Sequence, residues 1–313
     1  MASGKWTADL IPPQSGRRVV VTGANSGIGF ETARELARKG VEIVLPARTA
    51  AKAEDAADRI RCEIPSATVV SAVLDLASQA SIHDFASWYA LRYPGASIDL
   101  LINNAGVMAV PQRELTIDGF ERQFATNFLG PFALTALLYP QLRVQPGTRI
   151  VIVASSFTKW AKLDFSNLQS ERLYKPMVQA YSQSKLADLL FAFELQNRLT
   201  AAGSPVIATS AHPGYAITNI QTSGPGNSYS LRRFFDAFFM PIAAQGAAHG
   251  ALPILYAATS PEARAGGYYG PSGLCELKGY PTAVQIPHCA RDVEVAERLW
   301  REAERLTGIE FRV

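Results

Sequence analysis

Short apolar runs alternate with longer amphipathic stretches through the first two-thirds of the chain. The apolar runs are rich in Val, Ile and Leu, which is typical of strands that are buried on both faces of a sheet. We therefore predict six strands, in RVVVTG (18–23), VEIVLPAR (41–48), ATVVSAVLDL (67–76), IDLLINNAG (98–106), TRIVIVASS (148–156) and PVIATSAHPG (205–214).

The stretches between and after these runs have the apolar and charged faces of helices. They predict helices over 30–40, 49–64, 78–92, 116–143, 175–202, 245–259 and 291–306, with a short strand in GGYYG (266–270). Buried strands that alternate with helices form a parallel sheet, and right-handed crossovers place helices on both of its faces. The sequence thus predicts an α/β protein with a doubly wound parallel sheet, the Rossmann fold.

The organisation of the chain indicates one unit. No repeat, low-complexity tract or linker divides its 313 residues, and a hydrophobic content of 48% is enough for a large core. We expect residues 1–313 to form a single domain, with 1–16 as an N-terminal extension.

Charge, cysteine and histidine content exclude several classes of function. A net charge of +3 that is scattered along the chain gives no reason to expect a nucleic-acid partner. Cys62, Cys275 and Cys289 lie far apart, and the four histidines have no metal-ligand spacing, so we expect no disulfide framework and no metal site. Reduced, at least partly buried thiols and a cytoplasmic location fit this pattern.

Membrane association is not expected from the hydropathy of the chain. No segment approaches the roughly 20 apolar residues that span a bilayer, and the first residues do not resemble a signal sequence. The stretch LRRFFDAFFMPIAA (231–244) fits either a membrane surface or the wall of an apolar pocket. We favour the pocket.

A glycine-rich turn follows the first predicted strand and opens the first helix. In TGANSGIG (22–29), Gly23 permits a tight exit from the strand, Gly27 lets a pyrophosphate approach the backbone, and Gly29 allows close packing of the helix on the sheet. The N-terminus of the helix offers free N–H groups and partial positive charge. The turn therefore predicts a dinucleotide site.

The end of the second strand bears on the choice of dinucleotide. An acidic residue there binds the 2′-hydroxyl of NAD, whereas an arginine accommodates the 2′-phosphate of NADP. The sequence has Ala47 and Arg48 at this place, which favours NADP(H), with NAD(H) as the alternative.

Tyr181 and Lys185 are four residues apart in a predicted helix. Residues with this spacing share a helix face at about 6 Å. A nearby ammonium lowers the pKa of a phenol, which can then exchange a proton with a substrate oxygen. Other polar residues gather at the carboxyl ends of predicted strands, in NNAG (103–106) and at Ser155 and Ser156, where a doubly wound sheet binds its ligand.

These motifs together resemble the short-chain dehydrogenases/reductases. The similarity includes TGANSGIG, Asp75–Leu76, NNAG, Asn127, the two serines, YSQSK and HPG (212–214), in the order of that family and over nearly the whole chain. TGANSGIGFETARELARKG, LQSERLY and RLWREAERLTG are most similar to the branch of retinol dehydrogenases, WW-domain oxidoreductase and protochlorophyllide reductase-like proteins.

The resemblance implies roles for individual residues. Tyr181 would be the general acid/base, and Lys185 would lower its pKa and bind the nicotinamide ribose. Ser156, rather than Ser155, would hold the substrate oxygen, and Asn127 would support a water in a proton relay. The residues implied in cofactor binding are Gly23, Asn25, Ser26, Gly27, Ile28, Gly29, Arg48, Asp75, Leu76, Asn103, Ala105, Gly106, Tyr181, Lys185, Pro213, Gly214 and Thr218. Family members that prefer NADP often have a basic residue at the place of Ser26. Of the two basic residues that are typical of NADP preference, this chain therefore has only Arg48.

Two segments are expected to build the substrate pocket. Residues 157–180 form a long insertion before Tyr181, and 219–244 follow the last buried strand. They offer as apolar lining Phe157, Trp160, Leu163, Phe234, Phe235, Phe238, Phe239 and Met240. We expect a bulky apolar carbonyl compound or alcohol, such as a retinoid, steroid, lipid aldehyde or polyketide ketone.

A second hypothesis is a non-catalytic NADP(H)-binding redox sensor or scaffold. The complete set of Asn127, Ser156, Tyr181 and Lys185 argues against it, because a protein without turnover has no need of a proton path. The sequence leaves open whether the chain is a monomer or a homo-oligomer.

Overall fold

The computed structural model describes residues 5–215 and 245–313, so Thr218 and the segment 219–244 lie outside the described residues. Eight strands form one sheet in the order β3-β2-β1-β4-β5-β6-β7-β8. They are β1 (Arg18–Val21), β2 (Glu42–Ala47), β3 (Val69–Val73), β4 (Leu100–Asn103), β5 (Arg149–Val153), β6 (Ile207–Ala211), β7 (Tyr268–Pro271) and β8 (Pro281–Ala283). Strands β1 to β7 pair in parallel, as predicted.

The edge strand β8 departs from the prediction of a wholly parallel sheet. It pairs antiparallel with β7, with Tyr269 opposite Ala283 and Pro271 opposite Pro281. Its three residues begin with proline and are partly or fully exposed, so they have no buried apolar pattern. Short strands with proline are typical of sheet edges.

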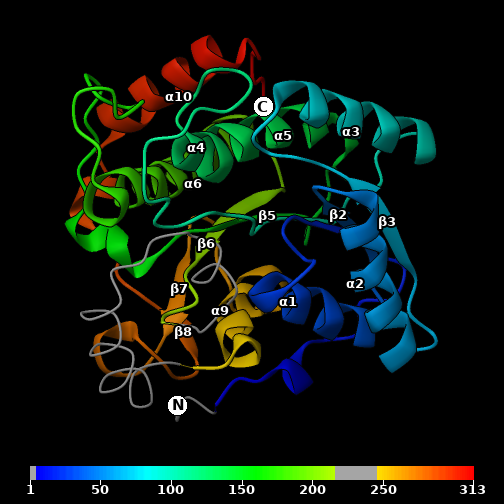
Figure 1. Ribbon diagram of the computed structural model, residues 1–313. Coiled ribbons are helices and arrows are strands. Elements are labelled where there is room, and N and C mark those ends of the chain that lie inside the picture. The colour runs from blue at the N-terminus through cyan, green and yellow to red at the C-terminus, as the bar shows by residue number, and fades with distance from the viewer. Residues whose placement is uncertain (1–4, 216–244) are drawn as a thin grey trace.

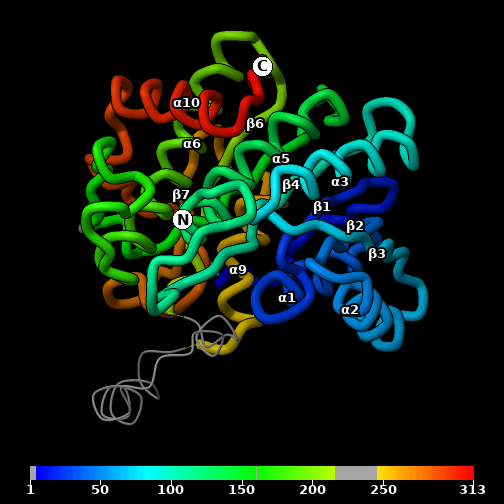
Figure 2. Tube along the Cα trace, turned by 45° about the horizontal axis from the view of Figure 1, so that its top comes forward, coloured from blue at the N-terminus to red at the C-terminus, as the bar shows by residue number. Residues whose placement is uncertain are grey.

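Helices cover both faces of the sheet, as Figures 1 and 2 show from two directions. On one face lie α1 (Gly27–Arg38), α2 (Ala50–Glu63) and α9 (Ala247–Thr259). On the other lie α3 (Gln79–Arg92), α4 (Arg122–Phe124), α5 (Gly130–Leu138), α6 (Ser182–Ala201) and α10 (Val293–Thr307). Short 3-10 turns occur at Ala8–Leu10, Tyr139–Gln141, Ser156–Trp160, Leu274–Glu276 and His288–Ala290.

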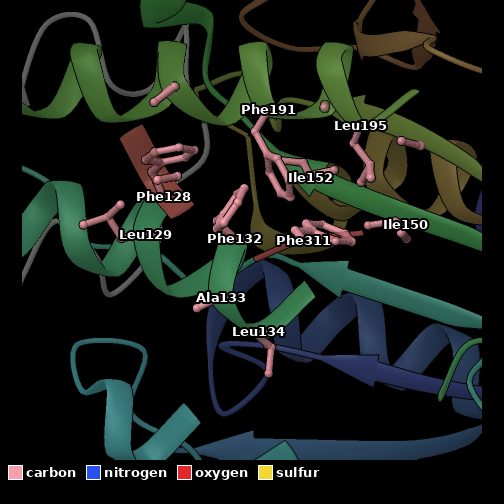
Figure 3. Close-up of a cluster of buried hydrophobic side chains, with 14 of the residues drawn as sticks. Phe128, Leu129, Phe132, Ala133, Leu134, Ile150, Ile152, Phe191, Leu195 and Phe311 are labelled. Atoms are coloured by element: carbon pink, nitrogen blue, oxygen red, sulfur yellow. The ribbon is translucent and has the colours of Figure 1, made fainter. Parts of the chain in front are cut away.

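The two faces enclose separate hydrophobic cores. Side chains alternate along a strand, so Val20 of β1 belongs to one core while Val19 and Val21 belong to the other. Figure 3 shows the first core, where Phe132 of α5 and Phe191 of α6 point toward each other, with ring centroids 5.4 Å apart.

The predicted helix over 116–143 is divided in the structure. It begins only at Arg122, because Glu121 caps it by accepting hydrogen bonds from the N–H groups of Gln123 (2.9 Å) and Phe124 (2.7 Å). A π-helical turn, η2 (Ala125–Leu129), then leads into α5. The helix predicted at 175–202 likewise begins with a π-helical turn, η5 (Pro176–Tyr181), before α6.

Three further sequence expectations can be compared with the described residues. None of the helices in 5–215 and 245–313 has the length and apolar character that a membrane crossing requires. Part of the N-terminal extension is packed, since Ile11 is buried and the Trp6 ring contacts Tyr256. The expected burial of thiols was wrong for Cys62 and Cys275, which are exposed because they lie on the outer side of α2 and in a surface turn.

Candidate active site

The glycine-rich turn forms an open cradle at the N-terminus of α1. Gly23 and Gly27 have φ values of +68° and +58°, which favour glycine. A Cβ on Gly23 would lie 2.8 Å from the Cα of Ala105, and one on Gly29 would meet the carbonyl of Gly23. Ser26 is the N-cap but makes no side-chain cap hydrogen bond, so N–H groups of the first turn stay available to an anion.

The loop after β4 lies beside this cradle. The Thr22 hydroxyl accepts hydrogen bonds from the N–H groups of Asn104 (3.0 Å) and Ala105 (3.0 Å). Thr22 and Asn104 were not predicted, although their adjacency to the two motifs was a signal. Asn103 is buried, and its amide donates to the Thr135 hydroxyl at 2.9 Å, so its side chain supports α5.

The predicted adenosine residues lie at the carboxyl ends of neighbouring strands. Arg48 follows β2 and is exposed, and its side chain has no hydrogen bond or ion pair within the described ranges. Asp75 and Leu76 follow β3, and the Asp75 carboxylate accepts a 2.9 Å hydrogen bond from the N–H of Ala77. The order of β3, β2, β1 and β4 in the sheet brings these residues to the same edge as the glycine-rich turn.

Asn127 lies in the π-helical turn η2, and its side chain makes three hydrogen bonds. Its Oδ1 accepts from the N–H of Val107 (2.8 Å), and its Nδ2 donates to the Val107 carbonyl (3.0 Å) and to the Ser184 hydroxyl (2.8 Å). Ser184 in turn donates to the main-chain carbonyl of Tyr181 at 2.8 Å. Tyr181 ends the other π-helical turn, η5. Such turns frequently mark functional sites.

Lys185 lies one turn beyond Tyr181, beneath the end of β5. Its Nζ donates to the carbonyl of Val153 (2.8 Å) and to Oδ2 of Asp188 (2.8 Å). Burial lowers the pKa of this ammonium, but the charges of Asp188 and Tyr181 raise it more, so the net shift of the Lys185 pKa is upward. The lysine is therefore charged, as its predicted role requires. Asp188 was not predicted.

The two serines after β5 have different environments. Ser155 is buried, and its hydroxyl accepts a 3.3 Å hydrogen bond from the N–H of Phe157, capping the 3-10 turn. Ser156 is the half-buried first residue of that turn, and its hydroxyl has no such capping bond. The ring of Phe157 lies 6.1 Å from that of Tyr181, so this segment borders the tyrosine.

The insertion 157–180 is tied firmly to the helices beside it. Gln183 of α6 accepts from the N–H of Asp164 (2.9 Å), and Gln169 accepts from the N–H of Glu121 (2.7 Å). The Gln123 amide also donates to the Tyr174 hydroxyl at 3.1 Å. These bonds make the insertion an ordered wall next to Tyr181.

The apolar lining that we expected from this insertion is only partly found. Phe157 is 37% exposed and free to contact a ligand, whereas Leu163 is half-buried and packs against the core. The side chain of Trp160 and the expected lining from Phe234 to Met240 lie outside the described residues.

A charged cluster that sequence reasoning missed forms a further wall. Glu276 accepts from the Lys159 ammonium (2.7 Å) and pairs with Nε2 of buried His212 (3.0 Å). Those partners hold the pKa of Glu276 down at about 2, against the effect of burial. Cys275 and Glu276 both have positive φ, 53° and 59°, a strained conformation that the cluster stabilises.

The predicted nicotinamide residues Pro213 and Gly214 directly follow His212 of this cluster in the chain. His212 Nδ1 accepts from the N–H of Gly214 at 3.3 Å, so this histidine stabilises the turn after β6. The Pro213 carbonyl accepts from the amide of Gln245 at 2.7 Å. Thr218 lies outside the described residues.

The uncapped glycine-rich turn and the Tyr181–Lys185 pair lie at one sheet edge, the arrangement expected of a nicotinamide-dependent oxidoreductase. A family model described as short chain dehydrogenase matches residues 17–226. Polyprenol dehydrogenase of Mus musculus is 39% identical over 311 residues, covering 97% of this chain and 88% of the mouse protein. Retinol dehydrogenase 13 of Homo sapiens is 40% identical over 299 residues, covering 94% and 86%. The chain belongs to the short-chain dehydrogenase family, in the branch that contains the retinol dehydrogenases.

Solved structures have the same fold. The crystal structure of an uncharacterized protein from Mycobacterium Paratuberculosis has a TM-score of 0.80 at 38% identity, covering 99% of this chain and 100% of that chain. A short chain dehydrogenase from Burkholderia cenocepacia J2315, in complex with NADP, has a TM-score of 0.61 at 22% identity, covering 82% and 96%. The second likeness concerns the fold alone.

Proposed function

We propose that the chain is an NADP(H)-dependent oxidoreductase that transfers hydride between the nicotinamide and a bulky, apolar alcohol or carbonyl compound of the isoprenoid class. The observation that carries the proposal is the continuous set of contacts from Asn127 through Ser184 to Tyr181, with charged Lys185 beside it. A sensor or scaffold has no use for this arrangement.

The described residues fit a phosphorylated dinucleotide. The cradle at Gly23 and Gly29 leaves no room for a Cβ, and Ser26 leaves the first turn of α1 uncapped for the pyrophosphate. Arg48 is exposed and its side chain has no partner among the described residues, so its forked guanidinium would bind the 2′-phosphate. Asp75, Leu76, Asn103, Ala105 and Gly106 would surround the adenosine. Pro213, Gly214 and Thr218 would bind the nicotinamide amide.

The side chains of the site supply the proton chemistry, while the bound nicotinamide supplies or accepts the hydride. The Tyr181 phenol donates a proton to the substrate oxygen in reduction and removes one in oxidation. The Lys185 charge favours the phenolate form. The Ser156 hydroxyl does not cap the 3-10 turn, and it hydrogen-bonds the same substrate oxygen. Asn127 holds a water that passes the proton on.

The substrate class rests on apolar surface and on the relatives. Phe157 borders Tyr181, and Val178, which lies in the same π-helical turn as Tyr181, is 76% exposed. Such exposed apolar side chains beside a reacting group favour a long apolar substrate. The names retinol dehydrogenase and polyprenol dehydrogenase of similar proteins point to an isoprenoid alcohol or aldehyde. The cytoplasmic location and the lack of membrane association stay predictions.

Turnover tests this proposal directly. Purified protein is incubated with NADPH and either retinal, a short polyprenal, or a small polar ketone of equal reactivity. We expect steady loss of NADPH absorbance with the two isoprenoid aldehydes and little with the polar ketone. Cofactor binding without consumption of any carbonyl would favour the sensor, and equal rates with all three compounds would contradict the substrate class.

A further inference from the structure

Asp188 lies one turn after Lys185 on α6, in the interior of the protein. Only 2% of its side chain and 6% of the Lys185 side chain are exposed. Within residues 5–215 and 245–313, the lysine supplies the one hydrogen bond to this carboxylate, and Asp188 Oδ1 has no partner. The carboxylate therefore acts on Lys185 and on nothing else described.

The position of the lysine ammonium is fixed by two acceptors. An ammonium has three N–H donors, and here two are used, by the Val153 carbonyl and by Asp188, each at 2.8 Å. A Cβ on Gly106 would lie 3.5 Å from Nζ, which places the loop after β4 against the ammonium. One donor thus remains for the groups of the site.

Burial makes this ammonium dependent on its partner. Burial is the largest influence on the Lys185 pKa and lowers it, and Asp188 is the first of the two groups that raise it, Tyr181 being the second. Burial also raises the pKa of Asp188 to about 7, against the attraction of the ammonium. Among the described residues, the Val153 carbonyl of β5 and the loop at Gly106 also lie against the ammonium, and both are uncharged.

We infer that Asp188 is a positioning residue for the reaction of this site: it keeps Lys185 charged and holds it in place beside Tyr181. This inference rests on the proposed function. A role in stability alone is a weak explanation, because the desolvation of a buried ion pair offsets much of its attraction. In this position the carboxylate preserves the positive charge that makes the phenol a proton donor and acceptor.

The first test is the pH profile of the variant Asp188→Asn, which keeps the shape of the side chain. Without the anion, burial dominates, and Lys185 loses its proton at lower pH. We expect the alkaline limb of kcat to move down by about one pH unit or more, roughly a tenfold loss on that side. The KM for the aldehyde should change less than about twofold, because the substrate does not contact Asp188.

A matched control is available on the same helix. Glu194 is a buried carboxylate that accepts a 2.7 Å hydrogen bond from Arg198, far along α6 from Tyr181. Glu194→Gln should lower the unfolding free energy but leave the pH profile of kcat unchanged. An equal shift of the profile in both variants would overturn the inference, since it would show a general effect of helix stability.

A double-mutant cycle separates action through the lysine from any other action. In the background Lys185→Met, adding Asp188→Asn should reduce residual turnover less than about twofold. Full additivity of the two losses would overturn the inference.

A readout without cofactor keeps the inference distinct from the proposed function. The ¹⁵N signal of Lys185 Nζ, assigned with Lys185→Met, is followed against pH in the cofactor-free protein. It should titrate at lower pH in Asp188→Asn than in the wild type, and identical titrations would overturn the inference. A wild-type protein that consumes no NADPH would overturn the proposed function alone.

Discussion

The side-chain amide of Asn127 donates a 2.8 Å hydrogen bond to the hydroxyl of Ser184. The same hydroxyl donates to the main-chain carbonyl of Tyr181 at 2.8 Å, and Ser184 is fully buried. One serine therefore joins the two π-helical turns that carry Asn127 and Tyr181. Its position between them fixes the relative placement of two proposed catalytic residues.

Removing this hydroxyl should disturb the proton path more than the binding of substrate. Ser184→Ala loses two buried hydrogen bonds, about 1 kcal/mol each, so we expect kcat to fall about ten- to thirtyfold with KM nearly unchanged. Steady-state kinetics with retinal and NADPH measure this split. Ser182→Ala, which loses a 2.6 Å bond to the Val178 carbonyl on the same helix, is the control and should retain kcat.

Tyr181→Phe should separate chemistry from cofactor binding. The variant keeps the ring and loses the proton donor, so turnover should fall by about 10²–10⁴-fold. NADPH affinity, measured by fluorescence titration, should stay within about twofold, because the phosphate cradle is untouched. Turnover that persists in this variant would assign the proton to another group.

Most of the fold could be predicted because apolar runs report burial directly. The strands from β1 to β6 fall within the six predicted runs. β8 could not be predicted, since three partly or fully exposed residues carry no periodic signal. The two π-helical turns were also missed, because the pattern of residue types is nearly the same for α and π winding.

The same distinction applies to the site. Glycines, strand-end polar residues and the Tyr181–Lys185 spacing are local signals, and the structure gathers those in its described part at one sheet edge. A single aspartate in a predicted helix gives no sign of burial, and Glu276 lies 64 residues from His212 in sequence. Only the tertiary packing shows that the first is buried against the lysine and the second against the histidine.

Phe157 is expected to contribute to substrate selection. Phe157 is 37% exposed and its ring lies next to that of Tyr181, so Phe157→Ala removes apolar surface beside the tyrosine. We expect KM for a polyprenal to rise about three- to tenfold, roughly 1 kcal/mol of lost burial, with no change for a small ketone. Val144→Ala, an exposed residue before the opposite end of β5, should change neither value.

Arg48 should decide between the two nicotinamide cofactors. Replacing it in Arg48→Asp removes the partner of the 2′-phosphate and offers a carboxylate to a 2′-hydroxyl. A charge-assisted hydrogen bond contributes about 1.5–3 kcal/mol, so the preference for NADPH over NADH should fall about 10- to 100-fold. The ratio of kcat/KM for NADPH to kcat/KM for NADH measures this preference. Arg59→Asp makes the same change of charge on exposed α2 and should leave the ratio intact.

Glu276 should confer a stability that depends on pH in a defined direction. Its pKa is lowered from 4.5 to about 2, first by the hydrogen bond with His212, so its contribution is complete above about pH 4.5 and is lost as pH falls toward 2. Glu276→Gln should lower the unfolding free energy by about 1–2 kcal/mol at neutral pH, allowing for the solvent that still reaches this partly exposed carboxylate. Urea unfolding at a series of pH values should show that the unfolding free energies of the wild type and the variant become equal near pH 2. Glu310→Gln, at the exposed pair with Arg312, is the control for loss of a surface carboxylate and should not reproduce the neutral-pH difference. If the difference in unfolding free energy between wild type and Glu276→Gln stays constant down to acid pH, the charge of the carboxylate does not stabilise this cluster.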